Sequence, residues 1–178
     1  MELVEGRPQD KRIDKEERVY DLLDQLNIDY QRIDHEEANT MEVCLEIEKS
    51  LKSTICKNLF LVNSNKSQYY LLMLKENKKF KTKVISKQIN SSRLSFGSDE
   101  KMLEYLDITP GSVSLLGLMN DHDFKVQLLM DKDLLQDEYL GCHPCINTSS
   151  LRIKMKDVFE KIMPFLHHEP IFVEVYDE

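Results

Sequence analysis

The run Ile55-Cys56-Lys57-Asn58-Leu59-Phe60-Leu61-Val62-Asn63 sets the architecture of this 178-residue chain. A polar, turn-forming segment at residues 63–67 follows it, and a second apolar run covers residues 68–74. Two β-prone runs joined by an Asn- and Ser-rich turn predict a β-hairpin. Lys57 is the one charged residue of the first run. It is therefore expected either at a strand end, with its amine reaching water, or at a binding site.

The spacing of apolar residues predicts both helices and strands around this hairpin. Apolar residues recur at helical spacing in residues 15–27, and Thr40 is expected to cap a second helix that runs to residue 51. Residues 139–146 are expected to form a loop. Further helices are expected over residues 82–88, 98–106 and 155–165, and Pro164 is expected to end the last of them. Further strands are expected over residues 30–33, 94–96, 125–130, 149–155 and 171–176, with residues 149–155 at an edge of the sheet.

These helices and strands do not alternate in the regular way of a doubly wound parallel sheet. The pattern favours an α+β fold with a mixed, partly barrel-like β-sheet surrounded by helices. Residues 1–14 are polar and unperiodic, so we expect a flexible N-terminal tail there. Residues 15–178 are expected to form a single domain, since their number is ordinary for one hydrophobic core.

The charge balance limits the partners that the chain can bind. The formal net charge is −8, so binding to nucleic acid would depend on a local basic patch and not on bulk charge. No apolar run is long enough for a membrane span, and the N-terminus lacks the layout of a signal peptide, so a cytoplasmic protein is expected. One candidate basic patch contains Lys75, Lys78, Lys79, Lys81, Lys83 and Lys87, and a solvated surface is its ordinary explanation.

A second informative fragment, Gly141-Cys142-His143-Pro144-Cys145-Ile146-Asn147-Thr148, contains a CxxC pair. A structural zinc site usually needs a second pair of Cys or His ligands, which the spacing of the other cysteines does not provide. A redox pair at the start of a helix is also poorly supported, because the preceding residues are charged. We therefore expect no metal and no cofactor.

Several residues could still carry chemistry without a metal. Lys57 could offer a fixed positive charge to a phosphate or a carbonyl oxygen, and backbone N–H groups near Gly141 could receive an oxyanion. His143 could be structural or catalytic. Residues 111–114, Gly-Ser-Val-Ser after Pro110, could form a plain type II turn or a loop that clamps a substrate. The usual motifs for a nucleophile with its base are absent from the sequence.

Five motifs in order carry a resemblance to a known family. The chain resembles the YbaK and prolyl-tRNA-synthetase-associated editing family, and within it the free-standing PrdX/ProX-type deacylases, from about residue 16 to residue 175. The motifs are Lys57-Asn58-Leu59-Phe60-Leu61, Arg93-Leu94-Ser95-Phe96-Gly97-Ser98, Thr109-Pro110-Gly111-Ser112-Val113-Ser114, Gly117-Leu118-Met119-Asn120-Asp121, and Gly141-Cys142-His143-Pro144 with Asn147-Thr148.

The resemblance implies a trans-editing hydrolase that cleaves the ester of mischarged tRNA(Pro), with alanyl-tRNA(Pro) as the expected substrate and without a covalent intermediate. It implies the tRNA(Pro) acceptor end as partner, and prolyl-tRNA synthetase as a second possible partner. The implied catalytic residues are Lys57, His143 and Gly141; the implied substrate-binding residues are Gly111, Ser112, Asn58, Asn147 and Thr148; and the implied tRNA-binding residues are Lys75, Lys78, Lys79, Lys81 and Lys83.

One position departs from the family pattern. The family's G-x-x-x-P loop maps to residues 111–115, where this chain has Leu115 in place of the proline. The departure puts the stiffness of the loop, and with it the selection of amino acids by size, in question. Two alternatives therefore stay open: a deacylase for cysteinyl-tRNA(Pro) or another small aminoacyl-tRNA, and a non-catalytic regulator that binds an amino acid or aminoacyl-tRNA.

Overall fold

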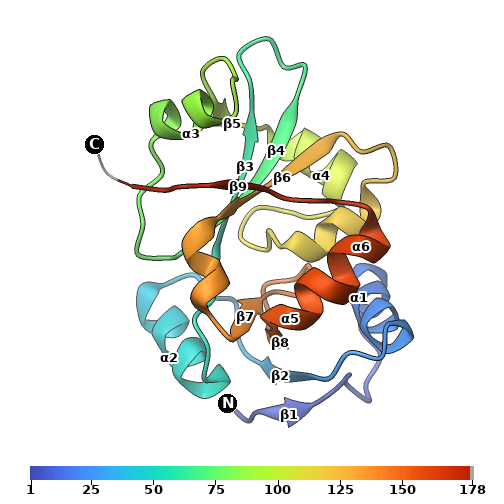
Figure 1. Ribbon diagram of the computed structural model, residues 1–178. Helices are drawn as coiled ribbons and strands as arrows, with labels where there is room; N and C mark the ends of the chain where they lie inside the picture. Colours follow the sequence, from blue (N-terminus) through green and yellow to red (C-terminus); the bar gives the residue numbers. More distant parts are fainter. Residues whose placement is uncertain (177–178) are drawn as a thin grey trace.

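The predicted hairpin forms the middle of the larger of two β-sheets in the computed structural model, which describes residues 1–176 (Figure 1). Its two strands pair antiparallel, with Phe60 opposite Leu71. Strands β4 and β6, and then β6 and β9, pair parallel, so this sheet is mixed as expected. The order across the sheet is β5 (Ser95–Phe96), β3 (Lys57–Val62), β4 (Tyr69–Leu74), β6 (Val126–Asp131) and β9 (Ile171–Val173).

The second sheet is antiparallel throughout and corrects two expectations. Its order is β1 (Val4–Glu5), β2 (Tyr30–Asp34), β8 (Ser149–Lys154) and β7 (Tyr139–Cys142). Residues 139–142, expected in a loop, form a strand because Leu140 and Cys142 are buried while the backbone pairs with β8. Strand β8, expected at an edge, lies between β2 and β7, and its fully buried Leu151 and Ile153 fit that interior position.

The two sheets meet at a single close backbone contact. Ile55, just before β3, forms an isolated parallel bridge with Gly141 of β7, and the Cys56 N–H donates to the Gly141 carbonyl oxygen at 3.3 Å. This bridge joins the end of one sheet to the other. The mixed, partly closed α+β fold expected from the sequence is therefore confirmed.

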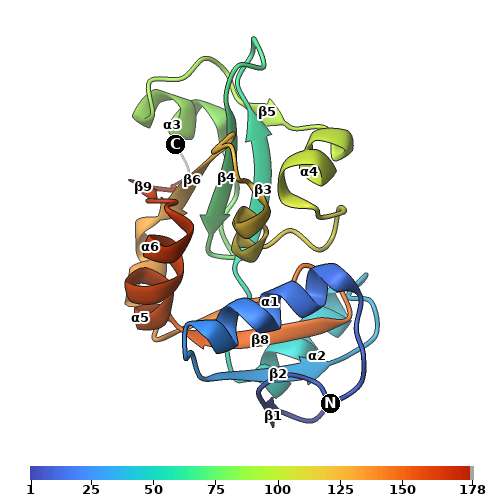
Figure 2. The same ribbon diagram turned by 90° about the vertical axis from the view of Figure 1, so that its right-hand side faces the viewer.

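Helices cover both sheets, and two of them begin at a residue whose side chain caps the helix. The Thr40 hydroxyl accepts from the Val43 N–H at 3.2 Å, and Ser98 caps a second helix in the same way through Lys101. Figure 2 shows α1 lying across the four-stranded sheet and α3 at the opposite end of the molecule. The helices are α1 (Asp14–Gln25), α2 (Met41–Leu51), α3 (Thr82–Gln88), α4 (Asp99–Leu106), α5 (Met155–Asp157) and α6 (Met163–Leu166), with 3-10 turns at Leu115–Asn120 and Lys132–Gln136.

Pro164 does not end the last helix, contrary to our expectation. A π-helical segment at Val158–Ile162 joins α5 to α6, and Pro164 lies in the first turn of α6. Pro164 has no N–H to donate, and it directly follows the π-helical segment, where the Met163 N–H donates to the Val158 carbonyl oxygen and the regular α-helical hydrogen-bond pattern is already interrupted. The helical stretch therefore continues to Leu166.

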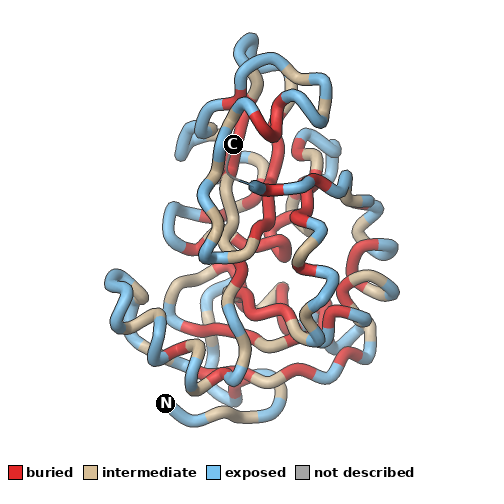
Figure 3. The backbone as a smooth tube through the Cα atoms, turned by 60° about the vertical axis from the view of Figure 1, so that its left-hand side comes forward, coloured by how far each residue is buried: buried red, intermediate tan, exposed pale blue. Residues whose placement is uncertain are grey.

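The hydrophobic core follows the alternation of side chains along β3. Phe60 and Val62 belong to the main core with α1, whereas Leu61 belongs to a second core with α3. Figure 3 shows the buried backbone running through the strands and the exposed backbone at the outer turns and helix faces. In residues 1–176, no helix is long and apolar enough to cross a membrane.

Residues 1–14 are more ordered than a flexible tail would be. Strand β1 pairs with β2, and the Arg7 guanidinium forms ion pairs with Glu17, Asp21 and Asp24 of α1. Arg12 similarly pairs with Asp34 at 3.0 Å. Charged residues of the segment that we expected to be a flexible tail form these ion pairs instead.

Candidate functional site

Two adjoining hollows bring together most of the residues expected at the site. The smaller, which we call the His143 cleft, has a volume of about 170 Å³ and is lined by Ile55, Cys56, Asn58, Gly111, Val113 and His143. The larger, which we call the Asn147 groove, has a volume of about 550 Å³. Gly111 lines both, so the hollows are adjacent. The groove is lined by Ile13, Lys15, Glu37, Ala38, Asn39, Thr109, Pro110, Gly111, Ser112, Ile146, Asn147 and Thr148.

The loop at Gly111 has the geometry of the type II turn expected from the sequence. Gly111 has a φ of +89°, and the Ser112 N–H donates to the Thr109 carbonyl oxygen at 3.2 Å. A positive φ at this turn position favours glycine, because a Cβ atom is strained there. A Cβ at Gly111 would also lie 3.5 Å from the Asn147 amide nitrogen, so the loop passes close to the groove wall.

His143 is held in one protonation state by its surroundings. Its Nδ1 lies 2.9 Å from the Ser149 carbonyl oxygen, which can only accept, so Nδ1 carries the proton. Burial lowers the pKa of His143 below its ordinary value of 6.5. The neutral ring therefore keeps an unprotonated Nε2 as a hydrogen-bond acceptor at the cleft.

Lys57 and Asn58 lie on opposite faces of β3. Asn58 lines the His143 cleft, and its amide nitrogen donates to the Cys56 carbonyl oxygen at 3.2 Å. Lys57 follows the face of Leu59 and Leu61, and its amine donates to the Lys78 carbonyl oxygen at 3.3 Å. The structure therefore places the amide, and not the ammonium group, directly at the cleft.

Gly141 lies behind the cleft at the bridge between the sheets. A Cβ atom there would meet the Thr54 carbonyl oxygen at 2.4 Å, so only glycine permits this approach of the two backbones. Nearby, Asn147 and Thr148 line the groove, and both accept hydrogen bonds from the segment that follows β2. The Ala38 N–H donates to the Asn147 side chain at 3.4 Å, and the His35 N–H donates to the Thr148 carbonyl oxygen at 3.0 Å.

Comparison with known proteins places this geometry in a family. The aminoacyl-tRNA editing domain matches residues 35–161, which include the His143 cleft and most of the groove. The chain belongs to the aminoacyl-tRNA editing domain family. The resemblance drawn from the sequence motifs is confirmed.

Individual relatives agree with this membership. The prolyl-tRNA editing protein ProX of Acetoanaerobium sticklandii is 32% identical over 85% of this chain and 92% of its own length. The prolyl-tRNA synthetase associated domain-containing protein 1 of Danio rerio is 24% identical over 90% of this chain and 88% of its own length. A solved structure of a candidate trans-editing enzyme for prolyl-tRNA synthetase superposes with a TM-score of 0.68 at 13% identity, covering 93% of this chain and 100% of that one, which shows a shared fold.

The basic patch of this editing domain is smaller than its sequence suggests. Lys75 pairs with Asp137 at 3.0 Å, and Lys78 pairs with both Asp131 and Asp133. Those two lysines are therefore largely neutralised by carboxylates. The remaining exposed lysines are Lys79, Lys81, Lys83 and Lys87. Lys83 and Lys87 belong to α3, which lies at the other end of the molecule from α1 and α2, and Lys79 and Lys81 lie on the segment that leads to α3.

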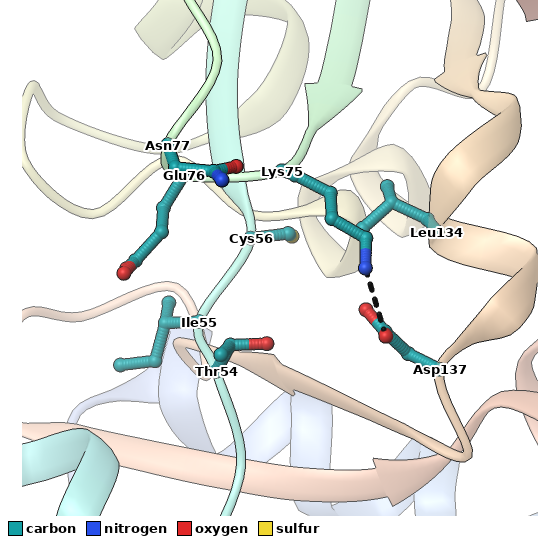
Figure 4. Close-up of a pocket in the computed structure, with 8 residues that line it drawn as sticks. All are labelled: Thr54, Ile55, Cys56, Lys75, Glu76, Asn77, Leu134 and Asp137. Carbon is teal, nitrogen blue, oxygen red and sulfur yellow. Dashed lines mark hydrogen bonds and ion pairs between the residues drawn. The ribbon is translucent and has the colours of Figure 1, made fainter.

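Figure 4 shows the hollow that Lys75 and Asp137 share, with the amine directed at the carboxylate across it. This hollow has a volume of about 260 Å³ and borders the His143 cleft, because Ile55 and Cys56 line both. Lys75 is paired with Asp137, and Glu76 adds a second carboxylate to the lining, so this hollow offers no free cation for a phosphate.

The four cysteines of the editing domain are free thiols, and three of them, Cys56, Cys142 and Cys145, are buried. Burial raises the pKa of Cys56 and Cys145 to about 12, and raises that of Cys142 as well, so all three stay protonated at neutral pH. Within residues 1–176, no group of three or more His, Cys, Asp or Glu side chains is arranged to hold a metal ion. Cys142 and Cys145 serve as core residues in this arrangement.

Reasoning from the sequence missed several residues at the site. Val113 and Ile55 line the cleft, and Lys15 lines the groove. Val113 comes shortly after Gly111 in the chain, so its position beside an expected site residue could have indicated it. No sequence motif indicated Lys15, because it reaches the groove only through the packing of α1 beside it.

Proposed function

We propose that this protein hydrolyses the ester bond of mischarged tRNA(Pro), with alanyl-tRNA(Pro) as its preferred substrate. Membership of the aminoacyl-tRNA editing family and the similarity to ProX support editing of tRNA(Pro). The observation that supports a small aminoacyl group such as alanine is the His143 cleft, about 170 Å³, beside a larger groove. The aminoacyl group enters the cleft, and the terminal nucleotide occupies the groove.

The proposed mechanism needs positioning more than a nucleophile. The ester of an aminoacyl-tRNA is already activated, so an enzyme that fixes the carbonyl and one water molecule can accelerate hydrolysis. The unprotonated Nε2 of His143 accepts a hydrogen bond from that water or from the vicinal hydroxyl of the terminal adenosine. The Asn58 amide and the backbone around Gly111 orient the aminoacyl group.

The chemistry of the thiols supports direct attack by water. Cys56 lines the cleft, but its pKa of about 12 leaves a negligible fraction of thiolate at neutral pH. The thiolate is the nucleophilic form of cysteine. A covalent thioester intermediate is therefore not part of the proposal.

A panel of aminoacylated tRNA(Pro) species tests the proposal. We expect rapid multiple-turnover hydrolysis of alanyl-tRNA(Pro) and little hydrolysis of prolyl-tRNA(Pro), because a small cleft rejects the larger ring by steric clash. Cysteinyl-tRNA(Pro) is the critical competitor, since the Leu115 departure keeps that specificity open. A preference for the cysteinyl ester would replace the proposed substrate, and binding without turnover would indicate a regulator.

Asn58 and Lys57 form a matched pair of variants. Asn58→Ala removes a group that lines the cleft, so we expect kcat for alanyl-tRNA(Pro) to fall about 10- to 100-fold with little change in KM. Lys57 could still attract a tRNA phosphate, because its amine has no acidic partner in residues 1–176. Lys57→Ala should therefore raise KM and reduce its salt dependence by about one phosphate contact.

Steady-state kinetics of both variants at several salt concentrations separate the two roles. Lys57→Arg, which keeps the charge, is the control for the lysine. Unchanged kinetics in Lys57→Ala would eliminate a role for that residue.

The exposed lysines near α3 give a prediction about tRNA binding. We propose that Lys79, Lys81 and Lys83 contact tRNA phosphates, and that Lys75 and Lys78 contribute less because carboxylates neutralise them. Changing the three exposed lysines to glutamate should weaken tRNA binding and flatten its salt dependence.

Fluorescence anisotropy with labelled tRNA(Pro), measured over a series of salt concentrations, checks this expectation. The control is the exposed pair Lys154 and Lys156, changed to glutamate, on the side of the smaller sheet. Equal losses in both variants would show that net charge matters and not this patch. Prolyl-tRNA synthetase remains a proposed partner, and co-purification of the two proteins would test it.

A further inference from the structure

A chain of hydrogen bonds runs from His143 away from the cleft. The Ser150 hydroxyl lies 3.3 Å from His143 Nδ1 and 2.9 Å from His35 Nε2. On its far side, His35 Nδ1 lies 2.7 Å from the Glu36 carbonyl oxygen. The two imidazole rings are 6.2 Å apart, and the serine hydroxyl joins them.

The direction of every bond in this chain follows from its two ends. The Glu36 carbonyl oxygen can only accept, so His35 Nδ1 donates, and in the neutral form of the ring Nε2 is left as an acceptor. Nε2 then receives the single hydroxyl proton of Ser150. Because the Ser150 hydroxyl donates its only proton to His35, its oxygen can only accept a hydrogen bond from His143 Nδ1. His143 is left with an unprotonated Nε2 at the cleft.

We propose that His35 is a positioning residue, which holds the Ser150 hydroxyl as an acceptor and so keeps it from opposing the tautomer of His143 that the Ser149 carbonyl oxygen favours. Without an acceptor at position 35, the Ser150 hydroxyl becomes free to turn and donate to His143 Nδ1. That donation favours the tautomer with the proton on Nε2, which removes the acceptor from the cleft. The Ser149 carbonyl oxygen opposes the change, so both tautomers should become populated.

Strand pairing holds the backbone around Ser150 in a fixed position. Ser150 pairs with Ile33 across β2 and β8, and both Ser149 and Ser150 are fully buried. The Ser149 hydroxyl donates to Asp34 at 2.6 Å, and Arg12 holds that carboxylate in turn. The backbone that carries Ser150 therefore has little freedom to adjust when His35 is changed.

The tautomer can be measured without any activity. In protein with ¹⁵N-labelled histidine, at a pH where His143 is neutral, we expect the two ring nitrogens of His143 to show one tautomer, with the proton on Nδ1. His35→Leu should shift these resonances toward a mixture of tautomers, whereas Ser150→Ala, alone or added to His35→Leu, removes the hydroxyl that would donate to Nδ1 and should keep the proton on Nδ1. His35→Gln, whose side-chain oxygen can accept from Ser150, should restore the wild-type signature.

The effect on catalysis rests on the proposed function. We expect His35→Leu to lower kcat for alanyl-tRNA(Pro) roughly tenfold at unchanged KM, as supporting groups around a reactive residue commonly do. His35→Gln should recover most of that loss. A purely structural role would lower the active fraction in both variants and leave the tautomer of the folded protein unchanged.

The two readouts distinguish the two hypotheses. Unchanged His143 resonances in folded His35→Leu, or a tautomer shift that persists when Ser150→Ala is added to His35→Leu, would overturn the positioning role, whatever the activity. A tautomer shift in a protein that does not hydrolyse any aminoacyl-tRNA would support the positioning role and refute the proposed function. If His35→Leu does not fold, His35→Ala, which also removes the acceptor, is compared with His35→Gln in its place.

Discussion

Replacing His143 with alanine should lower kcat for alanyl-tRNA(Pro) about 10²- to 10³-fold, within the range for loss of a residue that handles a proton. The physical reason is the loss of Nε2, the unprotonated acceptor that the Ser149 carbonyl oxygen and burial maintain at the cleft. Because we propose that other residues, the exposed lysines near α3, bind the tRNA body, KM should change much less. Single-turnover hydrolysis with excess enzyme measures the chemical step directly.

The pH dependence of the same rate gives an internal check. Burial lowers the pKa of His143, so the ring should stay neutral and active down to a pH below 6.5, the value of an exposed histidine. As the pH falls through the lowered pKa, Nε2 gains a proton and the rate should fall. The residual activity of His143→Ala should lack this acidic limb.

His143→Gln is the matched control for His143→Ala. The glutamine side chain can place an oxygen acceptor near the position of Nε2, so it should retain more activity than alanine. Thermal unfolding of both variants shows whether they remain folded, since leaving the buried Ser149 carbonyl oxygen without a partner costs about 1–3 kcal/mol. Full activity in folded His143→Ala would refute the proposed role of the ring.

The local features of this fold were predictable from the sequence because their causes are local. The hairpin at residues 55–74, the Thr40 and Ser98 caps and the type II turn at Gly111 each depend on residues that are close in the chain. Strand β7 was missed because a glycine inside a four-residue strand resembles a loop. The interior position of β8 was missed because strand order depends on pairing between distant segments.

The candidate site was predictable only in part. The glycine turn and His143 meet at one cleft, as the motif order suggested. The alternation of β3 could have shown that Lys57 and Asn58 cannot share a face, since neighbouring strand residues point to opposite sides. The contact of His35 with Ser150 could not be foreseen, because the two residues are 115 positions apart and meet through strand pairing.

Gly141→Ala should be among the most damaging single substitutions in this protein. Its Cβ atom would lie 2.4 Å from the Thr54 carbonyl oxygen and 3.2 Å from the Ile55 Cα, and both of these are backbone atoms that cannot swing aside. Overpacking of this kind typically costs about 1–3 kcal/mol. For a protein of this size, thermal unfolding should show a fall of about 2–4 °C for each kcal/mol lost.

The matched control is Gly6→Ala, which makes the same chemical change where no atom lies within 4 Å. Gly6 has a φ of +74°, so its variant measures backbone strain, about 1–2 kcal/mol, without a steric clash. A loss in Gly141→Ala no larger than in Gly6→Ala would contradict the close packing of the two sheets.

The same variant separates two roles for Gly141. If Gly141 donates a hydrogen bond to the oxyanion, the donor is its backbone N–H, which Gly141→Ala keeps. In that case kcat per folded molecule should change little in Gly141→Ala. The bridge between Ile55 and Gly141 instead joins the sheet that carries Asn58 to the strand that leads to His143. If the clash separates these strands, kcat per folded molecule should fall together with stability. Gly141 then acts by holding the two walls of the cleft at the distance that the substrate requires.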